Sequence, residues 1–187
     1  MSIALQKPMT LAEFLDWEEG QELRYEFDGL RPMAMTGGTA RHDLIGNRLR
    51  TLLTNRLDGK PCRCWGPTTK IEVEGRIRYP DAYVNCARVA PGATIIPEPV
   101  VVFEVLSPST SRTDRIEKLR EYQATPSIQR YVILEQDRIG AMVFSRQGEL
   151  WITNVLTEAD TLRMPEIGIE LSLAEIYADA DFSDVAA

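Results

Sequence analysis

The segment Val100-Val-Val-Phe-Glu-Val-Leu106 is a nearly continuous apolar run that contains one acidic residue, Glu104. A proline-rich loop over residues 91–99 precedes it and Ser107-Pro108 ends it, so the run has the length of a strand. Strands that are apolar along their whole length are buried on both faces, and we expect this one to be the central strand of a sheet. A buried ionised glutamate is unfavourable unless it is paired or binds a metal, which makes Glu104 a candidate functional residue.

The chain that follows this strand predicts a helix and then a meander of strands. The helix is expected at about residues 111–124, where Asp114, Lys118 and Tyr122 are spaced to share one face, and Thr125-Pro126 ends it. Strands are predicted over residues 130–135, 140–146 and 149–156, and a short helix over 173–178.

The chain that precedes the strand also alternates between helices and hairpins. Thr10 and Glu13 form the signature of a capping box, which predicts a short amphipathic helix that ends near Gly20. Asp28-Gly29 and Glu74-Gly75 predict two hairpin turns. Between them, a helix is expected over about residues 39–57, and its apolar stripe consists of Leu44, Ile45, Leu49, Leu52, Leu53 and Leu57. The second turn joins predicted strands over residues 68–73 and 76–85.

These elements predict one domain of the α/β (α+β) class, with a mixed β-sheet flanked by helices. A chain of 187 residues is long enough for one sizeable core. We expect an N-terminal arm over residues 1–9, the domain over residues 10–178, and a loose acidic tail over residues 179–187.

The composition, with 44% hydrophobic and 26% charged residues, is typical of a soluble globular protein. No apolar stretch has the length of a membrane helix, and residues 1–10 lack the pattern of a secretory signal, so we expect a cytoplasmic protein. The cysteines Cys62, Cys64 and Cys86 show no disulfide spacing, and the single histidine, His42, is distant in sequence. Structural thiols are therefore the preferred interpretation over a zinc site.

The net charge of −7 argues against a protein that binds nucleic acid through nonspecific attraction to phosphate alone. A site built from carboxylates would itself contribute negative charge, so a nucleic-acid enzyme is not excluded. Such an enzyme needs a local basic surface, and we expect it around Arg112, Arg115, Lys118 and Arg120.

Three residues predict the chemistry: Asp81 in Tyr79-Pro-Asp81, Glu104 in the buried strand, and Lys118 in the next helix. Neighbouring strands could bring Asp81 and Glu104 together, and two close carboxylates repel unless a cation lies between them. Oxygen ligands of this kind suit Mg²⁺ or Mn²⁺, and a nearby ammonium could position or help to deprotonate an attacking water. This order of residues predicts a phosphodiesterase site.

Each of these residues also has a structural alternative. Asp81 could cap a turn, Glu104 could form an ion pair with an arginine such as Arg130, and Lys118 could be a solvated helix lysine.

Seven features spread over nearly the whole chain carry a family resemblance: Arg24-Tyr-Glu-Phe-Asp-Gly29, His42, Tyr79-Pro-Asp81, Phe103-Glu-Val-Leu-Ser-Pro-Ser-Thr110, Asp114-Arg-Ile-Glu-Lys118, Tyr122 and Arg130-Tyr-Val-Ile-Leu134. With them the chain resembles the Uma-two family of restriction endonucleases, a branch of the PD-(D/E)XK nuclease superfamily. The resemblance implies a restriction endonuclease-like core.

The same resemblance implies roles for particular residues. Asp81, Glu104 and the main-chain carbonyl of Val105 would be ligands of Mg²⁺ or Mn²⁺, and Glu26 would be a further acidic member of the catalytic site. The D/E-x-K motif would place its lysine at position 106, where this chain has leucine. Lys118, from the next helix, matches the lysine that the family supplies instead.

Four further residues are candidates for contacts with the substrate phosphates. His42 could face the cleft, or it could be a helix-start residue that is bonded only to backbone. Ser109 could bind phosphate near a helix N-terminus, although turn formation explains it equally well. Arg112 and Arg115 belong to the predicted basic surface.

The function predicted from these observations is a Mg²⁺-dependent DNA endonuclease. We expect a homodimer, because two active sites cut both strands of a duplex more easily than one. The alternatives are a noncatalytic nuclease-fold module that binds nucleic acid or protein, and a hydrolase of small phosphoesters.

Overall fold

The computed structural model describes residues 8–35, 37–106 and 113–183, without the side chains of residues 113–115. The helices are α1 (Leu11–Glu18), α2 (Ala40–Arg56), the π-helix η1 (Thr113–Lys118), α3 (Leu119–Ala124) and α4 (Leu173–Ile176). The strands are β1 (Tyr25–Phe27), β2 (Pro32–Ala34), β3 (Arg63–Trp65), β4 (Ile71–Val73), β5 (Arg76–Arg78), β6 (Ala82–Asn85), β7 (Pro99–Val105), β8 (Arg130–Leu134), β9 (Gly140–Gln147), β10 (Leu150–Thr157), β11 (Thr161–Met164) and β12 (Ile169–Ser172). In the described residues, no helix is both long and apolar enough to cross a membrane.

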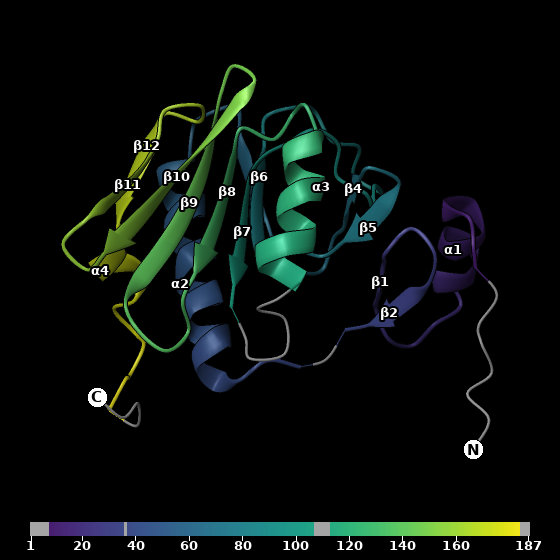
Figure 1. Cartoon of the computed structure of the whole chain (residues 1–187), viewed down its shortest axis with the longest axis horizontal. Coiled ribbons are helices and arrows are strands. Elements are labelled where there is room, and N and C mark those ends of the chain that lie inside the picture. The colour runs from purple at the N-terminus through teal and green to yellow at the C-terminus, as the bar shows by residue number, and fades with distance from the viewer. Residues whose placement is uncertain (1–7, 36, 107–112, 184–187) are drawn as a thin grey trace.

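The main sheet has six strands in the order β10-β9-β8-β7-β6-β3 (Figure 1). Strands β7 and β8 are parallel, with Val101 level with Arg130 and Val105 level with Leu134, whereas the other neighbours are antiparallel. The sheet is therefore mixed, as predicted. β7 lies between two other strands and is buried along nearly its whole length, which confirms the central strand expected from its apolar sequence.

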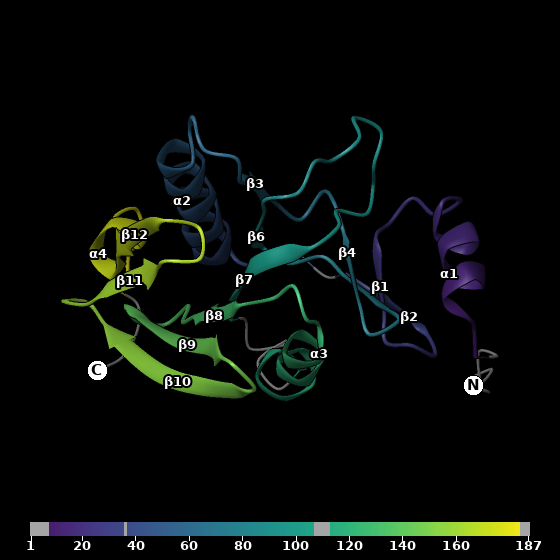
Figure 2. The same ribbon diagram turned by 90° about the horizontal axis from the view of Figure 1, so that it is seen from above.

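Helices α2 and α3 cover opposite faces of this sheet (Figure 2). Alternate side chains of β7 point to opposite faces, so Phe103 and Val105 join the core beside α2, whereas Val102 joins the core beside α3. The same alternation directs Glu104 toward α3. The predicted α/β (α+β) architecture is confirmed.

A second, four-stranded sheet in the order β2-β1-β5-β4 lies beside the main one, with α1 at its far side (Figure 2). A small separate core of Phe14, Phe27, Ile77 and Tyr79 joins α1 to this sheet. The predicted capping box is present, because Thr10 and Glu13 bond reciprocally at the start of α1.

The strand predicted over residues 76–85 is divided in two. Both hairpin turns form, and at the second one Glu74 and Gly75 have φ values of 50° and 71°. After this turn, β5 joins the four-stranded sheet and β6 joins the six-stranded sheet. The segment Tyr79-Pro-Asp81 connects them, because proline cannot donate the hydrogen bond that a continuous strand would need. This break brings Asp81 to the start of β6.

Two details of the sequence-based fold were wrong or incomplete. Leu44 is 44% exposed, so it does not belong to the buried stripe of α2, whose other predicted members are buried. The hairpin of β11 and β12 was not predicted.

Within the segment predicted to be a loose tail, the Asp181 carbonyl accepts a hydrogen bond from Arg41, and the Arg41 guanidinium lies over the Phe182 ring.

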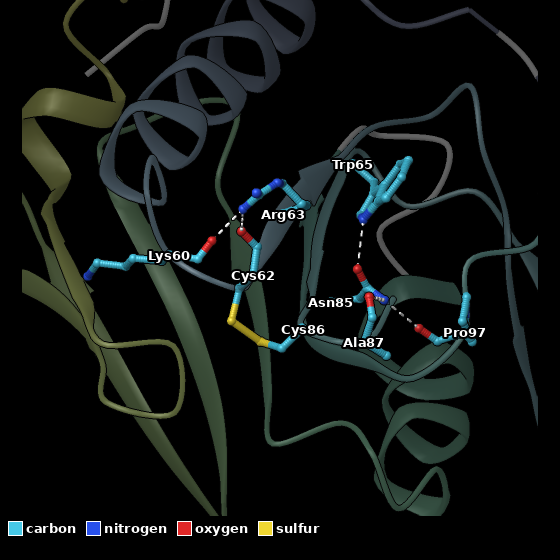
Figure 3. The surroundings of a disulfide bond; sticks show 8 residues. All are labelled: Lys60, Cys62, Arg63, Trp65, Asn85, Cys86, Ala87 and Pro97. Carbon is cyan, nitrogen blue, oxygen red and sulfur yellow. Dashed lines mark hydrogen bonds between the residues drawn. A yellow bond between two sulfur atoms is a disulfide. The ribbon is translucent and has the colours of Figure 1, made fainter. Parts of the chain in front are cut away.

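The expectation that the cysteines are all structural thiols was also wrong, because Cys62 and Cys86 form a disulfide (Figure 3). Strands β3 and β6 pair with Arg63 opposite Asn85, and the two cysteines lie one position beyond this pair. The two cysteines are 24 residues apart, and this spacing does not indicate that they pair. The pairing depends on the register between β3 and β6, which the sequence alone does not reveal. Cys64 is a free, partly buried thiol, and burial raises its pKa to about 12.

Candidate active site

Asp81 lies at the edge where β6 begins and β7 ends. Ala82 pairs with Phe103, and one step further along this antiparallel register Asp81 is opposite Glu104. Asp81 Oδ2 accepts a hydrogen bond of 2.7 Å from the main-chain N–H of Val105. The carboxylate is thus held against the neighbouring strand, and the alternative that Asp81 caps a local turn was wrong.

Glu104 and Lys118 form a buried ion pair across the space between β7 and α3. Lys118 Nζ is 2.8 Å from Glu104 Oε1, and the Tyr122 hydroxyl donates to the same oxygen at 3.0 Å. Glu104 is 4% and Lys118 5% exposed, so Lys118 is not a solvated helix lysine. Lys118 and Tyr122 share a helix face as predicted, although the helix turn that ends at Lys118 is a π-helix.

The alternative prediction that Glu104 forms an ion pair with Arg130 was wrong. Arg130 forms its ion pair with Glu166 instead, at 2.6 Å, and also donates to the Ser145 hydroxyl.

Glu26 reaches the same place from β1, far away in sequence. Its Oε1 lies 3.3 Å from Lys118 Nζ and accepts a hydrogen bond from the Tyr79 N–H at 3.2 Å, whereas Oε2 accepts from Arg78 at 3.1 Å. The ammonium of Lys118 therefore lies between two carboxylates that come from different sheets. Glu26, Glu104 and Lys118 converge as the sequence predicted.

Arg78 and Glu121 extend this arrangement and were missed by the sequence analysis. Arg78 is fully buried and donates two hydrogen bonds to Glu121, at 2.7 and 2.6 Å. Positive and negative side chains thus alternate along what we call the buried ion chain, which consists of Glu104, Lys118, Glu26, Arg78 and Glu121. The only sequence signal was an arginine next to apolar Ile77 in a short strand, and surface strands share that pattern.

The surroundings shift the pKa values of three groups at this site. Burial alone would raise the pKa of Glu26, but Lys118, Arg78 and the Tyr79 N–H together lower it. The hydrogen bond to Asp81 raises the pKa of His42 against the opposing effect of its burial. Burial and the nearby Glu104 carboxylate raise the pKa of Tyr122, so its hydroxyl keeps its proton and acts as a donor to Glu104.

His42 combines features of both predicted roles. Its backbone N–H bonds to the Thr39 hydroxyl at 3.2 Å, which is the contact expected of a helix-start residue. Its side chain points to the carboxylate edge, where Nε2 lies 3.3 Å from Asp81 Oδ2. His42 is therefore not bonded to backbone alone, and it faces the candidate site.

The family model described as "Uma2: Putative restriction endonuclease" matches residues 11–174. The chain belongs to the Uma2 family. A protein of Synechocystis sp. PCC 6803, described as uncharacterized, is 32% identical over 174 residues, which are 91% of this chain and 92% of that protein. This membership confirms the resemblance seen in the sequence.

A crystal structure from Anabaena variabilis, described as that of a "putative nuclease", superimposes on this Uma2 chain with a TM-score of 0.76. The match covers 91% of this chain and 98% of the other, at 18% sequence identity. At that identity the similarity establishes a shared fold, which confirms the predicted nuclease-like core.

In this Uma2 chain, the lysine at the site comes from the helix and not from β7. Leu106, at the position of the superfamily's motif lysine, is buried in the apolar core beside α3. Lys118 points from η1 to Glu104 and supplies an ammonium 2.8 Å from its carboxylate.

The predicted basic surface requires one correction. Lys118 is buried between carboxylates, so it cannot form part of an exposed basic surface, whereas Arg120 is exposed. Ser109, Arg112 and the side chain of Arg115 lie outside the described residues.

The candidate donor groups at the β6–β7 edge are the carboxylate oxygens of Asp81 and Glu104, which the register places on neighbouring strands. Within the described residues, no group of three or more His, Cys, Asp or Glu side chains could hold a metal ion. Two carboxylates on neighbouring strands are nevertheless compatible with Mg²⁺ or Mn²⁺, because these ions use one or two carboxylates and complete their shell with water and phosphate oxygens.

Proposed function

We propose that this chain is a Mg²⁺- or Mn²⁺-dependent DNA endonuclease that hydrolyses phosphodiester bonds. The proposal rests on one arrangement: Lys118 Nζ lies 2.8 Å from Glu104, and the strand register places Glu104 opposite Asp81. These residue types, in one place, are what the hydrolysis of a phosphodiester requires. Membership of the Uma2 family supports the same reaction.

Asp81, Glu104 and the main-chain carbonyl of Val105 would hold the ion. When bound, it would supply positive charge for the phosphate oxygens that become more negative during hydrolysis. The N–H of Val105 fixes the Asp81 carboxylate. The Tyr122 hydroxyl fixes one oxygen of Glu104, so both ligands are already oriented.

Lys118 would position the attacking water and favour the loss of its proton. Two carboxylates, Glu26 and Glu104, hold its ammonium beside the ligand edge. Because Arg78 in turn holds Glu26, the position of the ammonium depends on residues of both sheets.

DNA would lie across this edge, with His42, Ser109, Arg112 and Arg115 as contacts to its phosphates. A homodimer would supply two such sites for the two strands of a duplex.

Nicking of a supercoiled plasmid in Mg²⁺ or Mn²⁺ tests the proposal. We expect the wild-type chain to nick, and Asp81→Asn and Glu104→Gln to lose about 100-fold or more of the rate, because each removes a charged ligand. Glu170→Gln is the matched control, since that exposed carboxylate pairs with Arg163 on β11. Equal rates in all four proteins would overturn the proposal.

A noncatalytic binding module is the second candidate, and one observation favours it: no cluster of three metal-binding side chains occurs in the described residues. Calorimetry with Mn²⁺ separates the two functions. Heat of binding in the wild type that disappears in Asp81→Asn supports the nuclease, whereas DNA binding without any Mn²⁺ binding supports the module. Cleavage of small phosphodiesters without plasmid nicking would instead indicate a hydrolase of small phosphoesters.

A further inference from the structure

The outer edges of the sheets differ in how well they are protected against pairing with another strand. The edge strands β2, β3 and β4 have three residues each, and β2 begins with proline. β11 and β12 have four residues each and carry Arg163 and Glu170. Short length, proline and charge are the usual protections of exposed sheet edges.

β10 lacks all of these protections. It is eight residues long, contains no charged residue or proline, and pairs with β9 in a continuous register without a bulge. No strand among the described residues pairs with its outer side, and it lies at the margin of the molecule in Figure 2. Three large apolar side chains of this strand are exposed: Leu150 at 71%, Ile152 at 39% and Val155 at 70%.

We propose that β10 is the interface of a homodimer, in which two copies pair antiparallel along this strand about a two-fold axis at Thr153. In this register Leu150 lies opposite Leu156 and Trp151 lies opposite Val155, so these four apolar residues meet one another, whereas Ile152 lies opposite the uncharged Asn154. The two sheets become one continuous twelve-stranded sheet, since each contributes six strands.

The neighbouring registers are less favourable, which selects this one. An axis at Ile152 would place Glu149 opposite Val155, and an axis at Asn154 would place Leu150 opposite Glu158. Both would set a carboxylate against an apolar side chain at the interface. Of these three registers, the axis at Thr153 is the one that keeps both glutamates outside the apolar pairs.

The binding partner of β10 is the same strand of a second copy of this chain, because the strand is self-complementary in the antiparallel register described above. Two copies with a net charge of −7 each repel one another, so a stable contact between them must avoid charge. The uncharged β10 meets that requirement, and symmetric pairing of one strand with itself is the usual form of a two-fold interface.

The dimer leaves each candidate active site intact. Glu104 is level with Ile133, Met142 and then Val155 across the sheet, so the site lies three strands away from the interface. The two copies of β7 are separated by about seven strand spacings, or roughly 34 Å. Neither copy contributes a residue to the other's site. The inference identifies the contact surface of the homodimer proposed above, and its test requires neither metal nor DNA.

Sedimentation velocity of the full chain tests the interface. We expect a particle of twice the 21.1 kDa chain mass, and we expect Val155→Lys to raise the dimer dissociation constant at least 10-fold by placing ammonium groups within the contact. Leu30→Lys is the matched control, because Leu30 is an exposed leucine (58%) outside β10, and it should remain dimeric. A monomeric wild type, or a dimer that Val155→Lys leaves unchanged, would overturn the proposal.

Cross-linking tests the register without destabilising the contact. In a Cys64→Ser background, Thr153→Cys places two identical thiols opposite each other, and treatment with oxidised glutathione should give a covalent dimer. Asn154→Cys is the control, because residue 154 faces residue 152 of the other copy in this register. Equal yields from the two variants, or no covalent dimer from Thr153→Cys, would exclude the proposed pairing. Nicking activity is scored separately, so its absence does not affect this result.

Discussion

Lys118 and Glu104 are almost fully shielded from water, so neither charge can be solvated if the other is removed. The structure satisfies them through the buried ion chain, in which each cation contacts carboxylates on both sides. At the residue scale, the energetics of the site are therefore those of a connected network, and not of isolated pairs.

Replacing Lys118 by Met should destabilise the fold by about 3–5 kcal/mol, because it removes the buried ammonium that lies between the carboxylates of Glu104 and Glu26. Adding Glu104→Gln to Lys118→Met should restore part of that loss, since it removes one of the charges. Urea unfolding of the two single variants and the double variant measures this coupling. Strictly additive changes in the free energy of unfolding would contradict it.

Glu26 should make the stability depend on pH in the acid range. Its folded-state pKa is lowered from the ordinary value of 4.5, so its contribution is fully present above that value and is lost as the pH falls through the folded-state pKa. The difference in unfolding free energy between the wild type and Glu26→Gln should be largest at neutral pH and should shrink below about pH 4.5. Urea titrations across this range measure it. A difference that grows on acidification would show the opposite sign.

At the scale of elements, the register of paired strands determines which distant residues meet. The β6–β7 register places Asp81 opposite Glu104, and the β3–β6 register brings Cys62 and Cys86 together. The disulfide ties the three-residue edge strand β3 to the sheet that carries the site (Figure 3). A strand this short has few hydrogen bonds of its own.

Removing the disulfide should lower the free energy of unfolding by about 3.5 kcal/mol, the entropic value for closing a loop of this length. Thermal unfolding of the oxidised wild type, with and without a reducing agent, measures the change. The double variant Cys62→Ser with Cys86→Ser should unfold at a temperature that does not respond to the reducing agent. Cys64→Ser serves as the matched control and should keep the wild-type response.

At the scale of the whole molecule, the buried apolar side chains form three separate cores. Two large cores lie on the opposite faces of the six-stranded sheet, and the small third core joins α1 to the four-stranded sheet. The buried ion chain crosses between the sheets, because Glu26 and Arg78 belong to one and Glu104 to the other. The N-terminal part is thus connected to the candidate site by charge as well as by packing.

Phe14→Ala should lower the free energy of unfolding of the small core by about 3–5 kcal/mol, because Phe14 is fully buried there. Hydrogen exchange should report this loss first at the amides of α1, β1 and β2, while β7 and β8 keep their protection in the two large cores. Equal loss of protection in all of these elements would show that the small core does not open separately. Leu23→Ala, at a residue that is 61% exposed, is the control.

Much of the fold could be predicted because its signals are local. The apolar run around Glu104 predicted the central strand, the capping box predicted α1, and the two hairpin turns formed at Asp28-Gly29 and Glu74-Gly75. Residue types and a family resemblance indicated Glu26, Asp81, Glu104 and Lys118 as one group. A buried carboxylate is costly, so its presence in an apolar strand is informative even without a structure.

The sequence by itself therefore determined the element types, the central strand and the acidic residues with their lysine. Only the tertiary structure decided which charges neutralise one another: Arg78 with Glu121, Arg130 with Glu166, and Lys118 with both Glu26 and Glu104. It also decided the pairing of Cys62 with Cys86 and the burial of Lys118, which removed that residue from the predicted basic surface. The physical reason is that periodicity and capping act within a few residues of the chain. Ion pairs and disulfides instead depend on strand register and packing between segments far apart in sequence.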